Sequence, residues 1–277
     1  MDIAKRRLGS TDVDVTILGL GGEGVLRTFG REREAYSLIN QAIDMGINYF
    51  ESARAYAGSE LYYGKALRER RGDIFLTSKS HARDKEGASR HLVETLRNMK
   101  TDRLDLWQIH DVRTEDDIDT IFGHGGALEA FVRAKEKGLA RFIGITGHHD
   151  PEVICRCLNL FDFDTVLMPV NPAEPHYKDF LARVLPLATK KQMGVIGMKV
   201  YLRGLAARIP WYSSMEPFFR FALTNPVSTV VVGCDNLDQL EENVRIASSF
   251  IPMKSEETNS LVAAVKPYAR HLLYYKP

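Results

Sequence analysis

Apolar and polar positions along this chain form two patterns that alternate with a regular period. Short apolar runs that end in glycine or in polar residues predict buried strands, and longer segments with apolar residues at helical spacing predict helices. Segment 32–46 carries apolar side chains at 35, 38, 39, 42 and 43 and stops at a glycine, a helix-ending signal. Eight strand–helix units follow one another, each of roughly the length of a βα unit.

The predicted strands are 15–22, 48–51, 74–79, 104–110, 141–147, 165–171, 195–200 and 228–234. The predicted helices are 32–46, 61–67, 92–99, 128–138, 151–160, 180–191, 215–223 and 237–247. The strands are apolar on both faces, as parallel strands covered by helices should be. Eight such units in one undivided chain predict an α/β fold, a closed (β/α)8 TIM barrel that forms a single domain over residues 1–277. A doubly wound open sheet is the alternative. It would normally show GxGxxG after its first strand, and the glycines at 19–24 are not assigned to that signature, which favours the barrel.

Three segments lie outside the repeating units. Residues 1–14 are polar and charged with a turn signal at 9–10, which predicts an N-terminal hairpin. Residues 111–126, rich in Asp and Gly, are predicted to form a long loop that overhangs one barrel mouth with Phe122 and His124. Residues 251–277 predict a C-terminal extension with a helix at 256–265 and an aromatic tail over the same mouth.

Composition narrows the class of protein. The 277 residues are 44% apolar and 26% charged with a formal net charge of +1, which is typical of a globular protein with a substantial core. Basic residues form no run or stripe, so nucleic acid is not expected as a partner. The three cysteines show no CxxC spacing, which argues against a metal site and favours a reducing, cytoplasmic location. No long apolar run predicts a membrane segment.

Four chemically active side chains stand at or just after three consecutive predicted strands. Glu51 and Tyr56 follow the second strand, Lys79 ends the third and His110 ends the fourth. In a barrel these strand ends meet at one mouth. Each residue alone has an ordinary explanation, such as an ion pair or a packed loop residue, but together they predict a site.

These four groups suit the reduction of a carbonyl. A phenol with a pKa near 10 is a poor acid at neutral pH, and an adjacent ammonium stabilises its phenolate and is expected to lower that pKa. A carboxylate keeps the ammonium charged, and a histidine orients the carbonyl. Because side chains supply no hydride, a nicotinamide cofactor is expected.

The order Glu-x4-Tyr, Lys, His at successive strand ends resembles the aldo-keto reductase superfamily, and the resemblance extends over nearly the whole chain. Further matching segments are 7–9, 18–21, 46–50, 141–147, 194–199, 232–233 and 239–243. The resemblance implies that Tyr56 is the general acid, that Lys79 tunes it with Glu51, and that His110 orients the carbonyl. It assigns cofactor contacts to Gly21, Gly22, Thr146, Gly147, Asn171, Met198, Lys199, Arg203, Gly233, Asp235, Gln239, Glu242 and Asn243.

The chain departs from the family pattern in several places. Glu51 replaces the usual Asp, Leu167 stands for a glutamine, and Met198 for an aromatic residue that stacks on the nicotinamide. Lys199, Arg203 and Arg208 are candidates for binding the 2′-phosphate of the cofactor. We therefore expect NADP(H) as the preferred cofactor, with NAD(H) possible, and no metal.

The substrate is expected to be a small carbonyl compound, and the protein a monomer or small homo-oligomer. Aromatic residues of the tail and Trp211–Tyr212 suit an apolar or aromatic aldehyde or ketone, but they are equally normal for a packed extension. Two rival functions remain: a nicotinamide-binding regulatory protein with little turnover, and a Schiff-base aldolase or lyase that uses Lys79 or Lys199. A metal-dependent hydrolase is less favoured, because the first strand ends in glycines rather than in an HxH pair. His148 and His149 follow the fifth strand, point apart as adjacent residues do, and are expected to be exposed to solvent.

Overall fold

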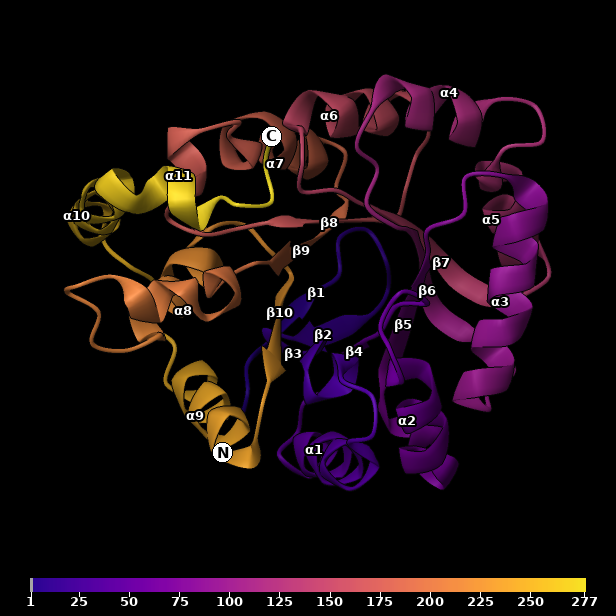
Figure 1. Ribbon diagram of the computed structural model, residues 1–277, viewed down its shortest axis with the longest axis horizontal. Coiled ribbons are helices and arrows are strands. Elements are labelled where there is room, and N and C mark those ends of the chain that lie inside the picture. Colours follow the sequence, from indigo (N-terminus) through magenta and orange to yellow (C-terminus); the bar gives the residue numbers. More distant parts are fainter. Residues whose placement is uncertain (1) are drawn as a thin grey trace.

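The fold is a closed barrel of eight parallel strands surrounded by helices (Figure 1). The computed structural model describes residues 2–277. The barrel strands, in chain order, are β3 (Leu18–Gly24), β4 (Tyr49–Glu51), β5 (Phe75–Ser80), β6 (Leu104–Ile109), β7 (Ala140–Thr146), β8 (Thr165–Pro169), β9 (Gly194–Met198) and β10 (Thr229–Cys234). Each strand pairs with its successor, and β10 pairs with β3 to close the barrel. The predicted (β/α)8 fold is therefore confirmed, and the open sheet is excluded.

Helices cover the outside of the barrel and form its C-terminal extension. They are α1 (Glu32–Asp44), α2 (Ser59–Ala66), α3 (Lys85–Met99), α4 (Glu115–Phe122), α5 (Ala127–Glu136), α6 (Pro151–Leu160), α7 (Phe180–Lys190), α8 (Glu216–Thr224), α9 (Leu237–Ser248), α10 (Ser255–Val265) and α11 (Ala269–Leu272). Short 3-10 turns are η1 (Val25–Arg27), η2 (Arg68–Asp73), η3 (Glu174–His176), η4 (Leu202–Arg208) and η5 (Lys266–Tyr268). The extension α10–α11 lies beside α8 and α7 in Figure 1.

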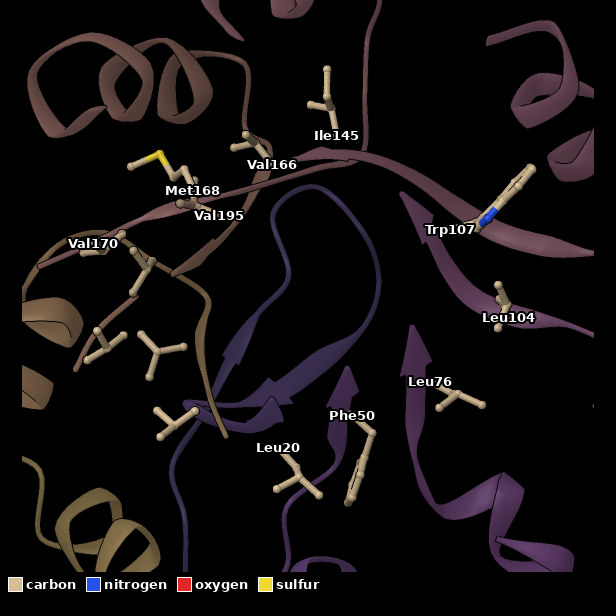
Figure 2. Packing of buried hydrophobic residues seen from close by; sticks show 14 of the residues in the cluster. Leu20, Phe50, Leu76, Leu104, Trp107, Ile145, Val166, Met168, Val170 and Val195 are labelled. Atoms are coloured by element: carbon tan, nitrogen blue, oxygen red, sulfur yellow. The ribbon is translucent and has the colours of Figure 1, made fainter. Parts of the chain in front are cut away.

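The two-residue period of the strands separates two layers of core. Phe50, Leu76 and Trp107 point outward and pack under the helices, as Figure 2 shows. Tyr49 and Phe75 alternate with them and point into the barrel, where their rings stack with centroids 5.5 Å apart. Since successive side chains alternate, Glu51 shares the interior face with Tyr49, and Lys79 shares it with Phe75. The pleat thus aims both charged groups into the barrel.

The predicted N-terminal hairpin is confirmed, and it closes the end of the barrel at which the strands begin. Strands β1 (Lys5–Arg7) and β2 (Asp14–Thr16) pair antiparallel, and Leu8 and Val15 belong to the interior core cluster. Gly9, with a φ of +57°, lies against the backbone of Gly194 at the start of β9. The hairpin leaves only the carboxyl ends of the strands for a site.

Two expectations are corrected by the structure. The predicted long loop 111–126 contains helix α4, and Phe122 packs edge-on against Phe163, whose ring centroid is 6.3 Å away. Residues 19–24, GLGGEG, do have GxGxxG spacing, yet in this barrel a Cβ at Gly21 would lie 2.9 Å from the backbone of Val232. Gly21 therefore lets β3 and β10 approach closely. Within residues 2–277, no helix is long and apolar enough to cross a membrane.

Candidate active site

A cavity of about 680 Å³ opens at the carboxyl ends of the barrel strands. It is lined by Glu23, Arg27, Ala55, Tyr56, Lys79, His81, Arg83, His110, Asp111, Arg113, Thr146, His148, His149, Leu167, Met198, Lys199, Arg203, Tyr274, Tyr275 and Lys276. Three of the four predicted catalytic residues line it directly, and Glu51 contacts one of them. The strand ends therefore do converge.

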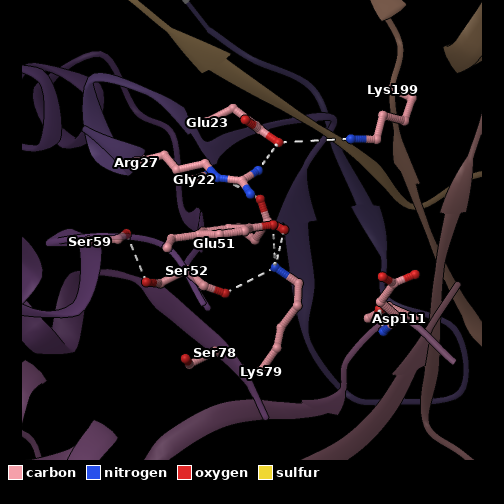
Figure 3. Close-up of polar contacts among 12 residues, drawn as sticks. Gly22, Glu23, Arg27, Glu51, Ser52, Ser59, Ser78, Lys79, Asp111 and Lys199 are labelled. Carbon is pink, nitrogen blue, oxygen red and sulfur yellow. Dashed lines mark hydrogen bonds and ion pairs between the residues drawn. The ribbon is translucent and has the colours of Figure 1, made fainter. Parts of the chain in front are cut away.

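The Glu51 carboxylate and the Lys79 ammonium form a buried ion pair (Figure 3). The second carboxylate oxygen of Glu51 accepts a hydrogen bond of 2.9 Å from Gly22 N. Lys79 Nζ also donates to the Ser52 carbonyl at 3.0 Å. Burial lowers the pKa of Lys79, and the charge of Glu51 opposes that effect. The longer glutamate thus reaches the lysine, and both charged groups have further partners.

The Tyr56 phenol lies against this pair. Lys79 Nζ is 3.4 Å from the phenolic oxygen, and the Arg27 guanidinium lies 5.1 Å from the ring centroid. A Cβ at Gly22 would lie 2.5 Å from two carbons of the Tyr56 ring, so only glycine leaves room for the ring at this position. The expected lowering of the phenol pKa is not found: burial, followed by the Glu51 charge, raises the pKa of Tyr56 well above its ordinary value. At neutral pH the phenol therefore keeps its proton.

His110 faces Tyr56 across the site. The two rings meet edge to face, with centroids 5.9 Å apart and an angle of 86° between their planes. Burial, with a further contribution from the Lys79 charge, holds the pKa of His110 well below its ordinary value. The imidazole is therefore neutral at physiological pH and does not compete with Lys79 for a counterion.

A basic cluster next to this centre was only partly predicted. The Glu23 carboxylate lies 2.8 Å from Arg27 and 3.8 Å from Lys199, and Figure 3 shows these three residues. Arg203 lies 3.4 Å from the same carboxylate. Lys199 is mostly enclosed, and burial lowers its pKa. Three cations around one carboxylate leave a positive excess that suits a polyanionic ligand. Glu23 and Arg27 were missed because the glycine run before them suggested only a strand end.

The wall beyond His110 is polar. Asp111 pairs with Arg113, and His148 Nε2 lies 3.3 Å from Asp111 Oδ1. Burial lowers the pKa of His148 to about 4, against the opposing charge of Asp111. The expectation that His148 is solvent-exposed is wrong for its side chain, which is only 18% exposed. The tail ring of Tyr275 covers it, with centroids 5.5 Å apart.

The residues to which cofactor contacts were assigned fall into two groups. Thr146, Met198, Lys199 and Arg203 line the cavity. The other nine are not among the residues that line it. The nine are Gly21, Gly22, Gly147, Asn171, Gly233, Asp235, Gln239, Glu242 and Asn243. Among them, the Asn243 side chain accepts from the Tyr201 hydroxyl at 2.8 Å, and Gln239 accepts from Asp235 N at 2.8 Å.

The C-terminal tail (Tyr274–Pro277) forms one side of the cavity and is held by a buried ion pair. Lys276 Nζ donates to Glu174 at 2.6 Å and to the carbonyls of Tyr177 and Lys178 at 2.8 and 2.7 Å. The Tyr275 hydroxyl donates to Glu174 at 2.7 Å and accepts from Asn171 at 3.0 Å. The expected aromatic cover over the mouth is thus present in Tyr274 and Tyr275. Phe122, His124, Trp211 and Tyr212 lie outside the cavity lining.

A model of the aldo/keto reductase family matches residues 17–210. The chain therefore belongs to this family of oxidoreductase enzymes, and the resemblance read from the strand ends is confirmed. Within residues 2–277, no group of three or more His, Cys, Asp or Glu side chains is arranged to hold a metal ion.

Individual relatives cover nearly the full length of the chain. It is 26% identical over 95% of its length to an uncharacterized oxidoreductase, YqkF, of Bacillus subtilis, of which it covers 96%. It is 27% identical over 98% of its length to the L-galactose dehydrogenase of Arabidopsis thaliana, of which it covers 97%. Among solved structures, the holo form of the aldo-keto reductase AKR11C1 from Bacillus halodurans superposes with a TM-score of 0.79 and 24% identity, covering 95% of this chain and 96% of that one.

Proposed function

We propose that this protein is an NADP(H)-dependent reductase that converts aldehydes or ketones to alcohols, with Tyr56 as the general acid. The observation that carries the proposal is the contact of 3.4 Å between the Tyr56 phenol and Lys79, whose ammonium is paired with buried Glu51. A nicotinamide, when bound, supplies the hydride. The proton is the part of the reaction that this chain supplies.

The environment of Tyr56 suits its role in the reduction. Burial and the Glu51 charge keep the phenol protonated at neutral pH, so it is ready to donate to a carbonyl oxygen. After donation, the Lys79 ammonium stabilises the phenolate by Coulomb attraction and by its hydrogen bond. His110, neutral and held edge-on to Tyr56, orients the carbonyl without adding a second charge.

The basic cluster around Glu23 fits a phosphorylated dinucleotide. We propose that Lys199, Arg203 and Arg27 hold its phosphates, because they outnumber the carboxylate they share. Thr146 and Met198 line the same cavity and would flank the nicotinamide. We also propose, from the family resemblance, contacts to Gly21, Gly22, Gly147 and Asn171. For the adenosine end of the cofactor, the proposed set is Gly233, Asp235, Gln239, Glu242 and Asn243.

The test measures the loss of cofactor absorbance when the protein is mixed with each member of a panel of aldehydes and ketones, once with NADPH and once with NADH. Because one relative is named L-galactose dehydrogenase, the panel includes aldoses and the oxidation of aldoses by NADP⁺ or NAD⁺. We expect turnover with NADPH and slower turnover with NADH. In Arg203→Met the preference for NADPH over NADH should decrease. No turnover with any carbonyl, together with tight NADPH binding, would instead support the regulatory function. Covalent trapping of a carbonyl on Lys79 or Lys199 by borohydride, without nicotinamide, would support an aldolase.

A further inference from the structure

Arg83, between β5 and α3, contacts the backbone of the strand end that carries His110. Its Nη1 donates to the His110 carbonyl at 2.8 Å, and its Nη2 donates to the Asp111 carbonyl at 2.7 Å. We propose that Arg83 is a positioning residue that fixes the His110 imidazole in the site. This inference rests on the proposed function, in which His110 orients the carbonyl.

The imidazole of His110 is held poorly by its own side-chain contacts. Its Nδ1 is buried without a hydrogen-bond partner anywhere in residues 2–277. The orientation of the ring therefore depends on its edge-to-face contact with Tyr56 and on the position of its backbone. Whatever holds that backbone also sets the direction of the imidazole.

The backbone after β6 needs this support because it leaves the strand in an uncommon conformation. His110 N donates to the Ser80 carbonyl at 2.9 Å and continues the pairing of β6 with β5. At Asp111 the chain turns, with a φ of +56°, into the left-handed region that non-glycine residues rarely adopt. Such a residue persists only when its surroundings determine it. Here Thr146 Oγ1 accepts from Asp111 N at 2.7 Å, and Arg83 binds the two carbonyls on either side of the turn.

Arg83 is itself fixed by one carboxylate and by its own backbone. Asp117 accepts from Arg83 Nε at 2.8 Å and from Arg83 Nη2 at 3.3 Å, and it also accepts from Arg113 N at 2.8 Å. The Arg83 carbonyl accepts from Ala127 N at 2.8 Å. A planar guanidinium is suited to this arrangement, because it can bind a carboxylate and two carbonyls at once. The Arg83 side chain thus joins the end of β6 to α4, while the Arg83 backbone is bonded to the start of α5.

The test compares Arg83→Met with Arg220→Met. Arg220 is a matched control, because it also binds one carboxylate, Glu257, and two carbonyls, those of Ile251 and Pro252, but outside the cavity lining. We expect kcat for carbonyl reduction to fall by about 10²-fold in Arg83→Met, since small displacements of catalytic groups have effects of that size. The affinity for NADPH should stay within about twofold, and Arg220→Met should keep kcat within about twofold.

A second measurement is independent of turnover. In histidine-labelled protein, the His110 imidazole resonances, assigned with His110→Asn, should shift or broaden in Arg83→Met and stay in place in Arg220→Met. Arg83→Lys, which keeps one donor group for the carbonyls, should restore part of kcat and part of the native His110 resonance. If Arg83→Met does not fold, the same two measurements are made on Arg83→Lys.

Unchanged His110 resonances in Arg83→Met would overturn the proposal, and so would an equal loss of kcat in Arg220→Met. If the native protein reduces no carbonyl, the proposed function fails, while the resonances still decide whether Arg83 positions His110.

Discussion

Nζ of Lys79 lies 3.4 Å from the phenolic oxygen of Tyr56, and the same ammonium is paired with the buried carboxylate of Glu51. The three groups come from the ends of β4 and β5 and from the loop between β4 and α2. The Glu51 carboxylate therefore holds the Lys79 ammonium in place, and the same ammonium donates a hydrogen bond to the Tyr56 phenol. This arrangement makes the state of each group sensitive to the other two, and the predictions below follow from it.

Removing the phenol hydroxyl should abolish the proton donor and leave the cavity otherwise intact. In Tyr56→Phe we expect kcat to fall by about 10²–10⁴-fold, the usual contribution of a positioned general acid. The affinity for NADPH should change little. Loss of cofactor absorbance measures the first quantity and fluorescence titration the second. Tyr36→Phe, at an exposed ring of α1, is the control, and full activity in Tyr56→Phe would remove Tyr56 from the mechanism.

A single methyl group at Gly22 should displace the catalytic phenol. The new Cβ would lie 2.5 Å from the Tyr56 ring, so the ring or the β3 backbone must move. We expect Gly22→Ala to lower kcat and to cost about 1–3 kcal/mol of unfolding free energy, as overpacking usually does. Gly72→Ala serves as the control, because a Cβ there meets nothing within 4 Å. Equal kinetics for the two variants would show that the ring has room to move.

Neutralising Glu51 should leave the Lys79 charge buried without its counterion. Removal of one partner of a buried ion pair typically costs about 3–5 kcal/mol. We therefore expect Glu51→Gln to lower the free energy of unfolding by that order, measured with urea at neutral pH. For comparison, Glu94→Gln breaks the more exposed pair with Arg54 and should change the free energy of unfolding far less than Glu51→Gln does. A small effect of Glu51→Gln would mean that Lys79 is held by other groups.

Acidification should destabilise the fold through His148. Burial lowers the pKa of His148 from 6.5 to about 4, so between these two pH values the unfolded chain binds a proton that the folded chain does not. Above pH 6.5 His148 is neutral in both the folded and the unfolded chain, and its burial then carries no penalty from protonation. As the pH falls toward about 4, protonation of the unfolded chain lowers the free energy of unfolding by about 3 kcal/mol. The wild type should therefore lose more stability over this range than His148→Asn, in urea titrations at several pH values. His124→Asn, at an exposed residue, should follow the wild type.

The strand-end residues could be predicted because each follows a recognisable apolar run. The two-residue period of a strand then determines which of its side chains face the barrel interior. Helix α4 was missed because only Ile118 and Ile121 are buried in it, and Asp and Gly around it resemble a loop. One signal was present: Thr114 and Asp117 have the spacing of a helix N-terminus, and Thr114 does accept from Asp117 N.

The sequence by itself determined the barrel, the strand ends and the identity of Glu51, Tyr56, Lys79 and His110 as candidate site residues. These follow from local periodicity and from the meeting of parallel strand ends at one mouth. Only the tertiary structure decided the raised pKa of Tyr56, the burial of His148 under Tyr275 and the gathering of three cations around Glu23. Those properties depend on desolvation and on distances between residues far apart in the chain, which no local pattern encodes.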